Sequence, residues 1–123
     1  MADMIFKIII AGGRDFSDYD MLRSEMDTFL SDFDSQDEIE VVSGCAKGAD
    51  RLGERYGVST GRLVRYFPAH WERYGSAAGP YRNREMAEYA NMCVVFWDGK
   101  SRGSKNMIDT ARELGLETHV VSY

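Results

Sequence analysis

Residues 5–13 read IFKIIIAGG, a nearly continuous apolar run that ends on two glycines. Only Lys7 interrupts the apolar residues from Ile5 to Ala11, which is typical of a strand buried on both faces of a parallel sheet. Gly12 and Gly13 end the run at the point where the chain must leave the sheet. This stretch therefore predicts the first strand of an α/β fold.

The rest of the chain alternates between strand and helix patterns. Short apolar runs predict four more strands, at Glu40–Ser43, Leu63–Phe67, Met92–Trp97 and Thr118–Val121. Apolar residues at helical spacing predict four intervening helices: one capped by Ser17 or Asp18, one carrying Ala49, Leu52 and Tyr56, one with Pro80 in its first turn after a loop at Ala69–Ala78, and one capped by Ser104.

Five strands that alternate with four helices, without a hairpin signal, indicate a five-stranded parallel sheet covered by helices on both faces. Right-handed crossovers favour the strand order 3-2-1-4-5. We therefore expect a Rossmann-like three-layer sandwich that forms one domain over residues 1–123.

Composition narrows the class of protein. With 44% hydrophobic residues, a chain of this length can bury a core without disulfides or metal. The formal charge of −5 lowers the expectation of binding to nucleic acid or to an anionic membrane. The apolar run Met4–Ala11 is too short to span a membrane and lacks a signal cleavage site, so we expect a cytoplasmic protein.

Cys45 and Cys93 are far apart and lack the spacing of a metal site or a disulfide framework, and His70 and His119 stand alone. No metal and no cofactor is therefore expected. An apolar helix face beyond what one sheet can bury would favour a homodimer.

In the expected strand order the chain reverses direction between strands one and four, and open α/β sheets bind ligands outside the carboxyl ends of the strands at that point. Three glycine-rich loops meet this edge: AGGRDF at 11–16, SGCAKGAD at 43–50 and WDGKSRGSK at 97–105. Their backbone N–H groups can approach an anion, and Arg14, Lys47 or Lys105 can neutralise a phosphate.

The helix entered at Gly79-Pro80 adds Arg82 and Arg84 to the same edge, although only one of the two can face the ligand. Neither GxGxxG nor GxxxxGK[ST] occurs, which argues against an ordinary NAD dehydrogenase and against a P-loop NTPase. Trp71 and Trp97 lie where an aromatic ring could stack on a base, or where it could cover the edge of the core.

Taken in order, AGGRDF, SGCAKGAD, FPAHW, GPYRNREM and FWDGKSRGS resemble the SLOG superfamily, most closely its YspA-type branch, over about Ile8 to Ala111. The resemblance implies a Rossmann-like domain that recognises nucleotides or nucleotide-derived molecules, in a superfamily whose members act as enzymes, sensors and DNA-handling proteins.

SGCAKGAD is similar to the SGxAxGID segment of the DNA-processing protein DprA. This similarity implies that Ser43, Gly44, Lys47 and Gly48 line an anion site. It also implies that Asp50 orients the loop or a sugar hydroxyl.

YRNREM and DGKSRGS resemble the RKxxM and PGGxGTxxE segments of the LONELY GUY phosphoribohydrolases. Arg82 falls on that family's functional arginine, and Gly103-Ser104 on its phosphate turn. Asn83 stands where the family has lysine, and Met107 where it has the essential glutamate. Because methionine cannot assist hydrolysis, the resemblance carries over phosphate binding but not that catalysis.

These observations give one ligand site and three candidate functions. The residues expected to bind the ligand or its phosphate are Gly12, Gly13, Arg14, Ser43, Gly44, Lys47, Gly48, Arg82, Asn83, Gly103, Ser104 and Lys105. The favoured function is binding or sensing of a nucleotide-derived small molecule. The alternatives are an N-glycosidic hydrolase that uses Asp50 or Asp98, and DprA-like handling of single-stranded DNA.

Overall fold

The computed structural model describes residues 4–123 and contains one parallel sheet with the strand order β3-β2-β1-β4-β5. The strands are β1 (Ile5–Gly12), β2 (Glu38–Ser43), β3 (Leu63–Tyr66), β4 (Met92–Trp97) and β5 (Glu117–Ser122). The expected fold class and strand order are confirmed. β2 begins two residues earlier than expected because Glu38 and Ile39 pair with Ile5 and Phe6 of β1.

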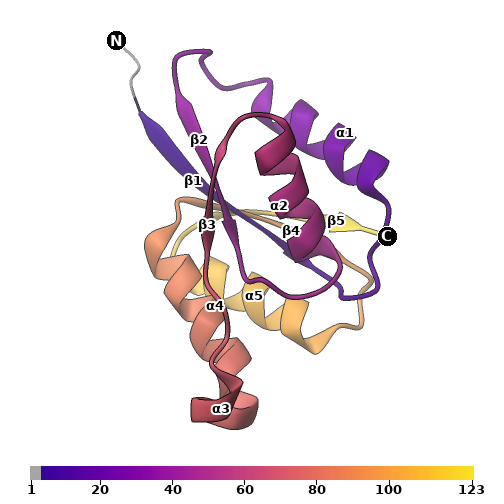
Figure 1. The fold of residues 1–123 in the computed structure, drawn as a ribbon, viewed down its shortest axis with the longest axis vertical. Coiled ribbons are helices and arrows are strands. Elements are labelled where there is room, and N and C mark those ends of the chain that lie inside the picture. The colour runs from indigo at the N-terminus through magenta and orange to yellow at the C-terminus, as the bar shows by residue number, and fades with distance from the viewer. Residues whose placement is uncertain (1–3) are drawn as a thin grey trace.

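Helices cover both faces of the sheet (Figure 1). They are α1 (Tyr19–Leu30), α2 (Ala49–Ser59), α3 (Trp71–Tyr74), α4 (Ala78–Tyr89) and α5 (Arg102–Glu113), with a 3₁₀ turn at Gly75–Ala77. α1 and α2 lie on one face of the sheet, and α4 and α5 lie on the other. The result is a three-layer Rossmann-like sandwich.

Alternate residues of the central strand β1 supply the two apolar cores. Ile8 and Ile10 point toward α1 and α2, whereas Ile9 and Ala11 point toward α4 and α5. All four are buried, as the period of two along a strand requires. The apolar run that begins the chain is thus shared between both layers of helices.

The segment between β3 and α4 differs from the expected loop at Ala69–Ala78. Its backbone folds into the single turn α3, in which the N–H groups of Arg73 and Tyr74 donate to the carbonyl of His70. α3 projects beyond the sheet at the start of α4 (Figure 1). The Tyr74 and Tyr81 rings contact each other at 4.7 Å between centroids, which holds α3 against α4.

The last helix begins earlier than expected. Ser101, not Ser104, is its N-cap, because the Ser101 side chain accepts a hydrogen bond from the Ser104 N–H. The Trp97 indole also donates to the Ser101 carbonyl at 3.0 Å, which fixes this cap near the end of β4. Ser104 therefore lies inside the first turn. None of the helices in residues 4–123 is long and apolar enough to cross a membrane.

Candidate functional site

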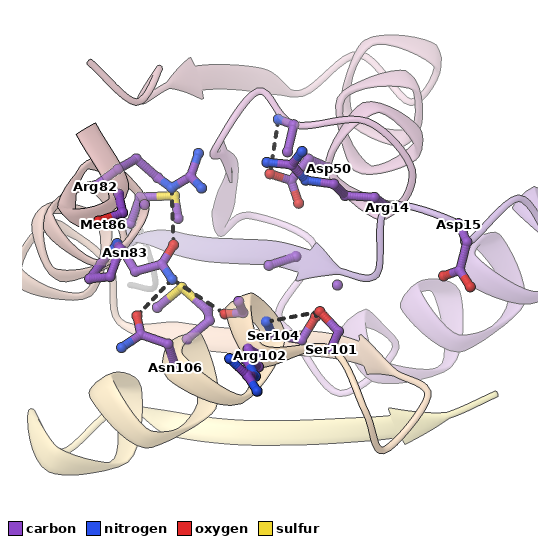
Figure 2. Close-up of a pocket in the computed structure, with 18 of the residues that line it drawn as sticks. Arg14, Asp15, Asp50, Arg82, Asn83, Met86, Ser101, Arg102, Ser104 and Asn106 are labelled. Atoms are coloured by element: carbon purple, nitrogen blue, oxygen red, sulfur yellow. Dashed lines mark hydrogen bonds between the residues drawn. The ribbon is translucent and has the colours of Figure 1, made fainter. Parts of the chain in front are cut away.

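A cavity of about 570 Å³ lies at the carboxyl ends of β1 and β4, where the chain reverses direction across the sheet. Of the residues singled out in the sequence, those that line it are Gly12, Arg14, Asp50, Trp71, Arg82, Asn83, Asp98, Gly103 and Ser104. Figure 2 shows side chains that enter it from α2, from α4 and from the start of α5. Its volume is within the usual range for small-molecule sites.

The remaining candidates lie outside the cavity lining. They are Gly13, Ser43, Gly44, Lys47, Gly48, Trp97 and Lys105. Lys105 pairs with Asp109 at 2.7 Å along the exposed side of α5, and Trp97 anchors Ser101. The ligand roles assigned to these residues stay predictions.

The loop after β1 is held between two neighbouring elements. The Gly13 N–H donates to the Phe96 carbonyl of β4 at 3.0 Å, and the Gly13 carbonyl accepts from the Ala49 N–H of α2 at 3.1 Å. Gly48 adopts a φ of 78° directly against this loop, where a Cβ would overlap the Gly13 carbonyl. The backbone around Arg14 is thus fixed before any ligand binds.

Ser43 has a structural position at the end of β2. Its buried hydroxyl donates to Glu54 Oε2 at 2.6 Å and accepts from the Cys45 N–H at 3.1 Å. These contacts shape the turn that follows β2. The carbonyl of the next residue, Gly44, accepts a hydrogen bond from Arg82 Nη1 of α4.

Arg82 and Asn83 begin a hydrogen-bond network that joins α4 to α5. Arg82 Nε donates to Asn83 Oδ1 at 3.0 Å, and Asn83 Nδ2 donates to Asn106 Oδ1 at 2.9 Å and to the Gly103 carbonyl at 3.4 Å. Asn83 is buried, so these bonds satisfy an amide that would otherwise be costly to bury. The network orients the Arg82 guanidinium toward the cavity (Figure 2).

The start of α5 forms the opposite side of the cavity. The Asp98 carboxylate accepts from the N–H groups of Lys100 at 2.8 Å and Ser101 at 2.9 Å, and these bonds lower the pKa of Asp98. As the first two helical residues, Arg102 and Gly103 have N–H groups that no carbonyl of the helix can accept. The helix dipole adds partial positive charge at this point.

Asp50 is the buried carboxyl group of the cavity. It lies in the first turn of α2, is 5% exposed and accepts a hydrogen bond from the Ala46 N–H at 3.2 Å. Burial raises the pKa of Asp50 to about 6, although the Ala46 N–H, Arg82 and Arg14 favour its charged form. A carboxyl with this pKa can hold or release a proton near neutral pH.

The floor of the cavity is apolar. Met86 of α4 and Met107 of α5 are each 1% exposed, line the cavity and belong to the same apolar core cluster. Trp71, which is 49% exposed, forms part of the wall together with Gly79. An apolar floor with a few polar and charged groups that fix orientation is the usual make-up of a small-molecule site.

Several lining residues were not among the sequence candidates. Arg102 falls within the quoted loop WDGKSRGSK, so its charge and position could have identified it. Asn106 could not have been found in this way, because its contact with Asn83 joins two helices. Asp15 also lines the cavity, and its carboxylate accepts from the Tyr123 hydroxyl at 2.6 Å. Within residues 4–123, no cluster of three or more His, Cys, Asp or Glu side chains could hold a metal ion.

Comparison with known proteins gave two matches. The family described as YspA, cpYpsA-related SLOG matches residues 6–74. The chain is also 30% identical, over an aligned length of 123 residues, to the Gene 61 protein of Mycobacterium phage D29, with 89% of this chain and 91% of that protein covered. No solved structure matched the chain.

Proposed function

The chain belongs to the YspA, cpYpsA-related SLOG family, and from this premise we propose that it binds a phosphate-bearing, nucleotide-derived ligand in the cavity beside β1 and β4. Membership of the SLOG family suggests binding or processing of a nucleotide-related ligand. What the cavity adds is a set of groups suited to binding such a molecule.

The observation that carries the proposal is the convergence of three arginines from separate parts of the chain. Arg14 comes from the loop after β1, Arg82 from α4 and Arg102 from the start of α5, and all three line one cavity. Guanidinium groups bind phosphate through several N–H donors in a fixed plane. Three of them around one cavity favour a ligand that carries phosphate.

The start of α5 is the second support. A Cβ built on Gly103 would meet no atom within 4 Å, so the first turn of this helix is open to the cavity. An anion placed there can receive hydrogen bonds from the Arg102 and Gly103 N–H groups and is favoured by the helix dipole. Trp71, half exposed on the wall, offers a surface on which a base can stack.

The floor favours binding over cleavage. Met107 occupies the position where the LONELY GUY phosphoribohydrolases, which this segment resembles, carry their essential glutamate, and it is buried in the apolar lining of the cavity. A thioether can neither stabilise an oxocarbenium ion nor activate water. The proposed role is therefore binding or sensing.

One observation favours a hydrolase as the second candidate. Asp50 faces the cavity and has a pKa raised to about 6 by burial, so it can act as a general acid toward a leaving group. Asp98 is the other lining carboxylate that the sequence suggested. Incubation with a panel of nucleotides, followed by chromatography for free base, tests this candidate. Equal turnover by Asp50→Asn, Asp98→Asn and the parent protein would eliminate both assignments.

The binding proposal is tested by thermal unfolding with AMP, ADP, ADP-ribose and cyclic nucleotides. A ligand at a hundredfold excess over its Kd should stabilise the protein by about 2.7 kcal/mol. In Gly103→Asp the new Cβ meets no atom within 4 Å, and the added carboxylate repels an anion, so the shift should disappear while the unliganded protein stays at least as stable as before.

The matched control is Gly103→Asn, which has nearly the same shape without the charge and should retain the shift. If no phosphorylated nucleoside stabilises the protein, or if Gly103→Asp responds like Gly103→Asn, the proposal is wrong.

A further inference from the structure

We propose that the Asp50 carboxyl contacts the anionic group of the ligand as a hydrogen-bond donor, so that one proton is taken up when the ligand binds. The inference rests on the proposed function, because it concerns how the same cavity accepts a phosphate. It makes Asp50 a determinant of ligand specificity rather than a catalytic residue.

Asp50 of α2 and Arg82 of α4 both line the cavity and approach each other closely over Gly44, where no side chain would fit. A Cβ built on Gly44 would lie 2.7 Å from Arg82 Nη1 and 2.8 Å from Asp50 Oδ2. Among the ion pairs formed by residues 4–123, none joins Asp50 to Arg82. Both groups face the cavity without pairing with each other, so a ligand oxygen held by Arg82 in the cavity has Asp50 nearby (Figure 2).

An ionised Asp50 would repel that oxygen, and burial makes the repulsion stronger than it would be in water. Asp50 Oδ2 already accepts from the Ala46 N–H, which leaves Oδ1 to carry a proton. A neutral carboxyl can then donate its O–H to a phosphate oxygen, and such bonds to anions are among the stronger hydrogen bonds in proteins. The arrangement is favourable only with the proton present.

The charged and titratable groups around Asp50 allow the charge of Asp50 alone to change when the ligand binds. They are Arg14 from the loop after β1, Arg82 from α4, Arg51 and Glu54 from α2, Cys45 after β2 and Cys93 of β4. The arginines stay charged, and burial raises the pKa of both thiols, which stay neutral. Glu54 is bound by Ser43 and Arg51.

Because the pKa of Asp50 is about 6 without ligand, the free-energy cost of protonating it at neutral pH is small. An anion beside the group raises that pKa further, since a neighbouring negative charge disfavours a second one. If only the protonated form binds, the affinity falls about tenfold for each pH unit above 6.

The test uses the full chain with ADP-ribose and with inorganic sulfate, because the charge of neither probe changes between about pH 6 and 8. Titration calorimetry in buffers of different ionisation enthalpy should show uptake of close to one proton by the wild-type protein at about pH 7.5. This measurement on the wild-type protein does not depend on the folding of any variant.

Asp50→Asn supplies an uncharged N–H donor of the same shape. Its affinity should be nearly constant over this pH range and should exceed that of the wild-type protein by at least tenfold at about pH 8. Equal pH dependence in the two proteins, or weaker binding by Asp50→Asn at every pH, would overturn the inference and leave the proposed function intact. Absence of saturable binding by both proteins with both probes would overturn the inference, and absence of binding to every nucleotide in the panel would overturn the proposed function.

Discussion

Asp50 illustrates how one buried side chain sets the properties of the cavity. It accepts a hydrogen bond from the Ala46 N–H, lines the cavity together with Arg82 and is only 5% exposed. The similarity of SGCAKGAD to the DprA segment implied that Asp50 orients the loop or a sugar hydroxyl. Its burial depends on α4 and on the loop after β1, so the pKa could not be read from the segment.

The raised pKa of Asp50 makes a prediction about the stability of the protein without ligand. Because the folded state holds this proton more tightly than the unfolded chain, Asp50 lowers stability as pH rises from about 4 to about 6, by roughly 3 kcal/mol. Above about pH 7 its effect is constant. Urea denaturation of the wild-type protein and Asp50→Asn across this range measures it.

The variant, which lacks the titrating group, should gain stability relative to the wild-type protein as pH rises from 4 to 6. A stability difference between the two proteins that does not change with pH would show that the Asp50 carboxyl titrates normally.

Gly12 makes a second prediction at this scale. A Cβ at this position would overlap the Phe96 carbonyl of β4, and a backbone atom inside a sheet cannot move aside. Gly12→Ala should therefore cost at least about 3 kcal/mol of unfolding free energy. Gly103→Ala is the control, because its Cβ enters open space and should change stability by less than about 1 kcal/mol. Similar stability of the two variants would contradict the packing described here.

At the scale of elements, the chain's patterns predicted the sheet better than they predicted the helix ends. Alternation of apolar runs and helical spacing was enough for the strand order, because crossover handedness leaves few choices. Ser104 was the wrong cap because Ser101 also precedes the apolar stripe, and the indole bond from Trp97 selects it. α3 gave no signal because one turn is too short to show a period.

The residues of the candidate site could likewise be predicted only in part from the sequence. Residues in the glycine-rich loops could be proposed from the sequence, since the carboxyl ends of parallel strands meet at one edge. The separation of lining residues from supporting ones, such as Ser43, could not be proposed, because it depends on which way each side chain turns.

The bond between Asn83 and Asn106 gives a prediction for α4 and α5. Asn106→Ala leaves the Nδ2 donor of the buried Asn83 with only its 3.4 Å bond to the Gly103 carbonyl, which should cost about 1–3 kcal/mol of stability. Since Asn83 also orients Arg82, nucleotide binding should weaken as well. Denaturation and titration calorimetry measure the two effects.

The control is Asn91→Ala, which removes a hydrogen bond to the Lys7 N–H at the opposite edge of the sheet and should leave binding unchanged. If both variants bind nucleotide like the wild-type protein, the network does not support the site.

At the scale of the whole molecule, charge is unevenly distributed. Positions 15–40, which include α1, hold ten acidic residues and one arginine, whereas three arginines and three aspartates line the cavity. The charged groups therefore repel an anion much less at the cavity than on the surface beside α1. A long nucleic acid needs a continuous cationic groove, which this distribution does not favour.

Single-stranded DNA should consequently bind weakly. We expect no gel-shift complex between the protein and an unstructured oligothymidylate at low salt, where electrostatic attraction is strongest. A stable complex that weakens steeply with added salt would instead favour the DprA-like alternative. The homodimer expected from the sequence stays a prediction, and sedimentation of the full chain would test it.

The central claim, that a nucleotide-derived ligand occupies the cavity beside β1 and β4, is tested most directly by an NMR titration of ¹⁵N-labelled protein with the same nucleotides. Saturable shifts are expected for the backbone amides of the lining residues, namely Gly12, Arg14, Asp15, Ala46, Asp50 and Arg102–Ser104. Thr60–Leu63, at the amino-terminal edge of the sheet, should stay unchanged. Shifts confined to that opposite edge, or no saturable shift with any phosphorylated nucleoside, would contradict the claim.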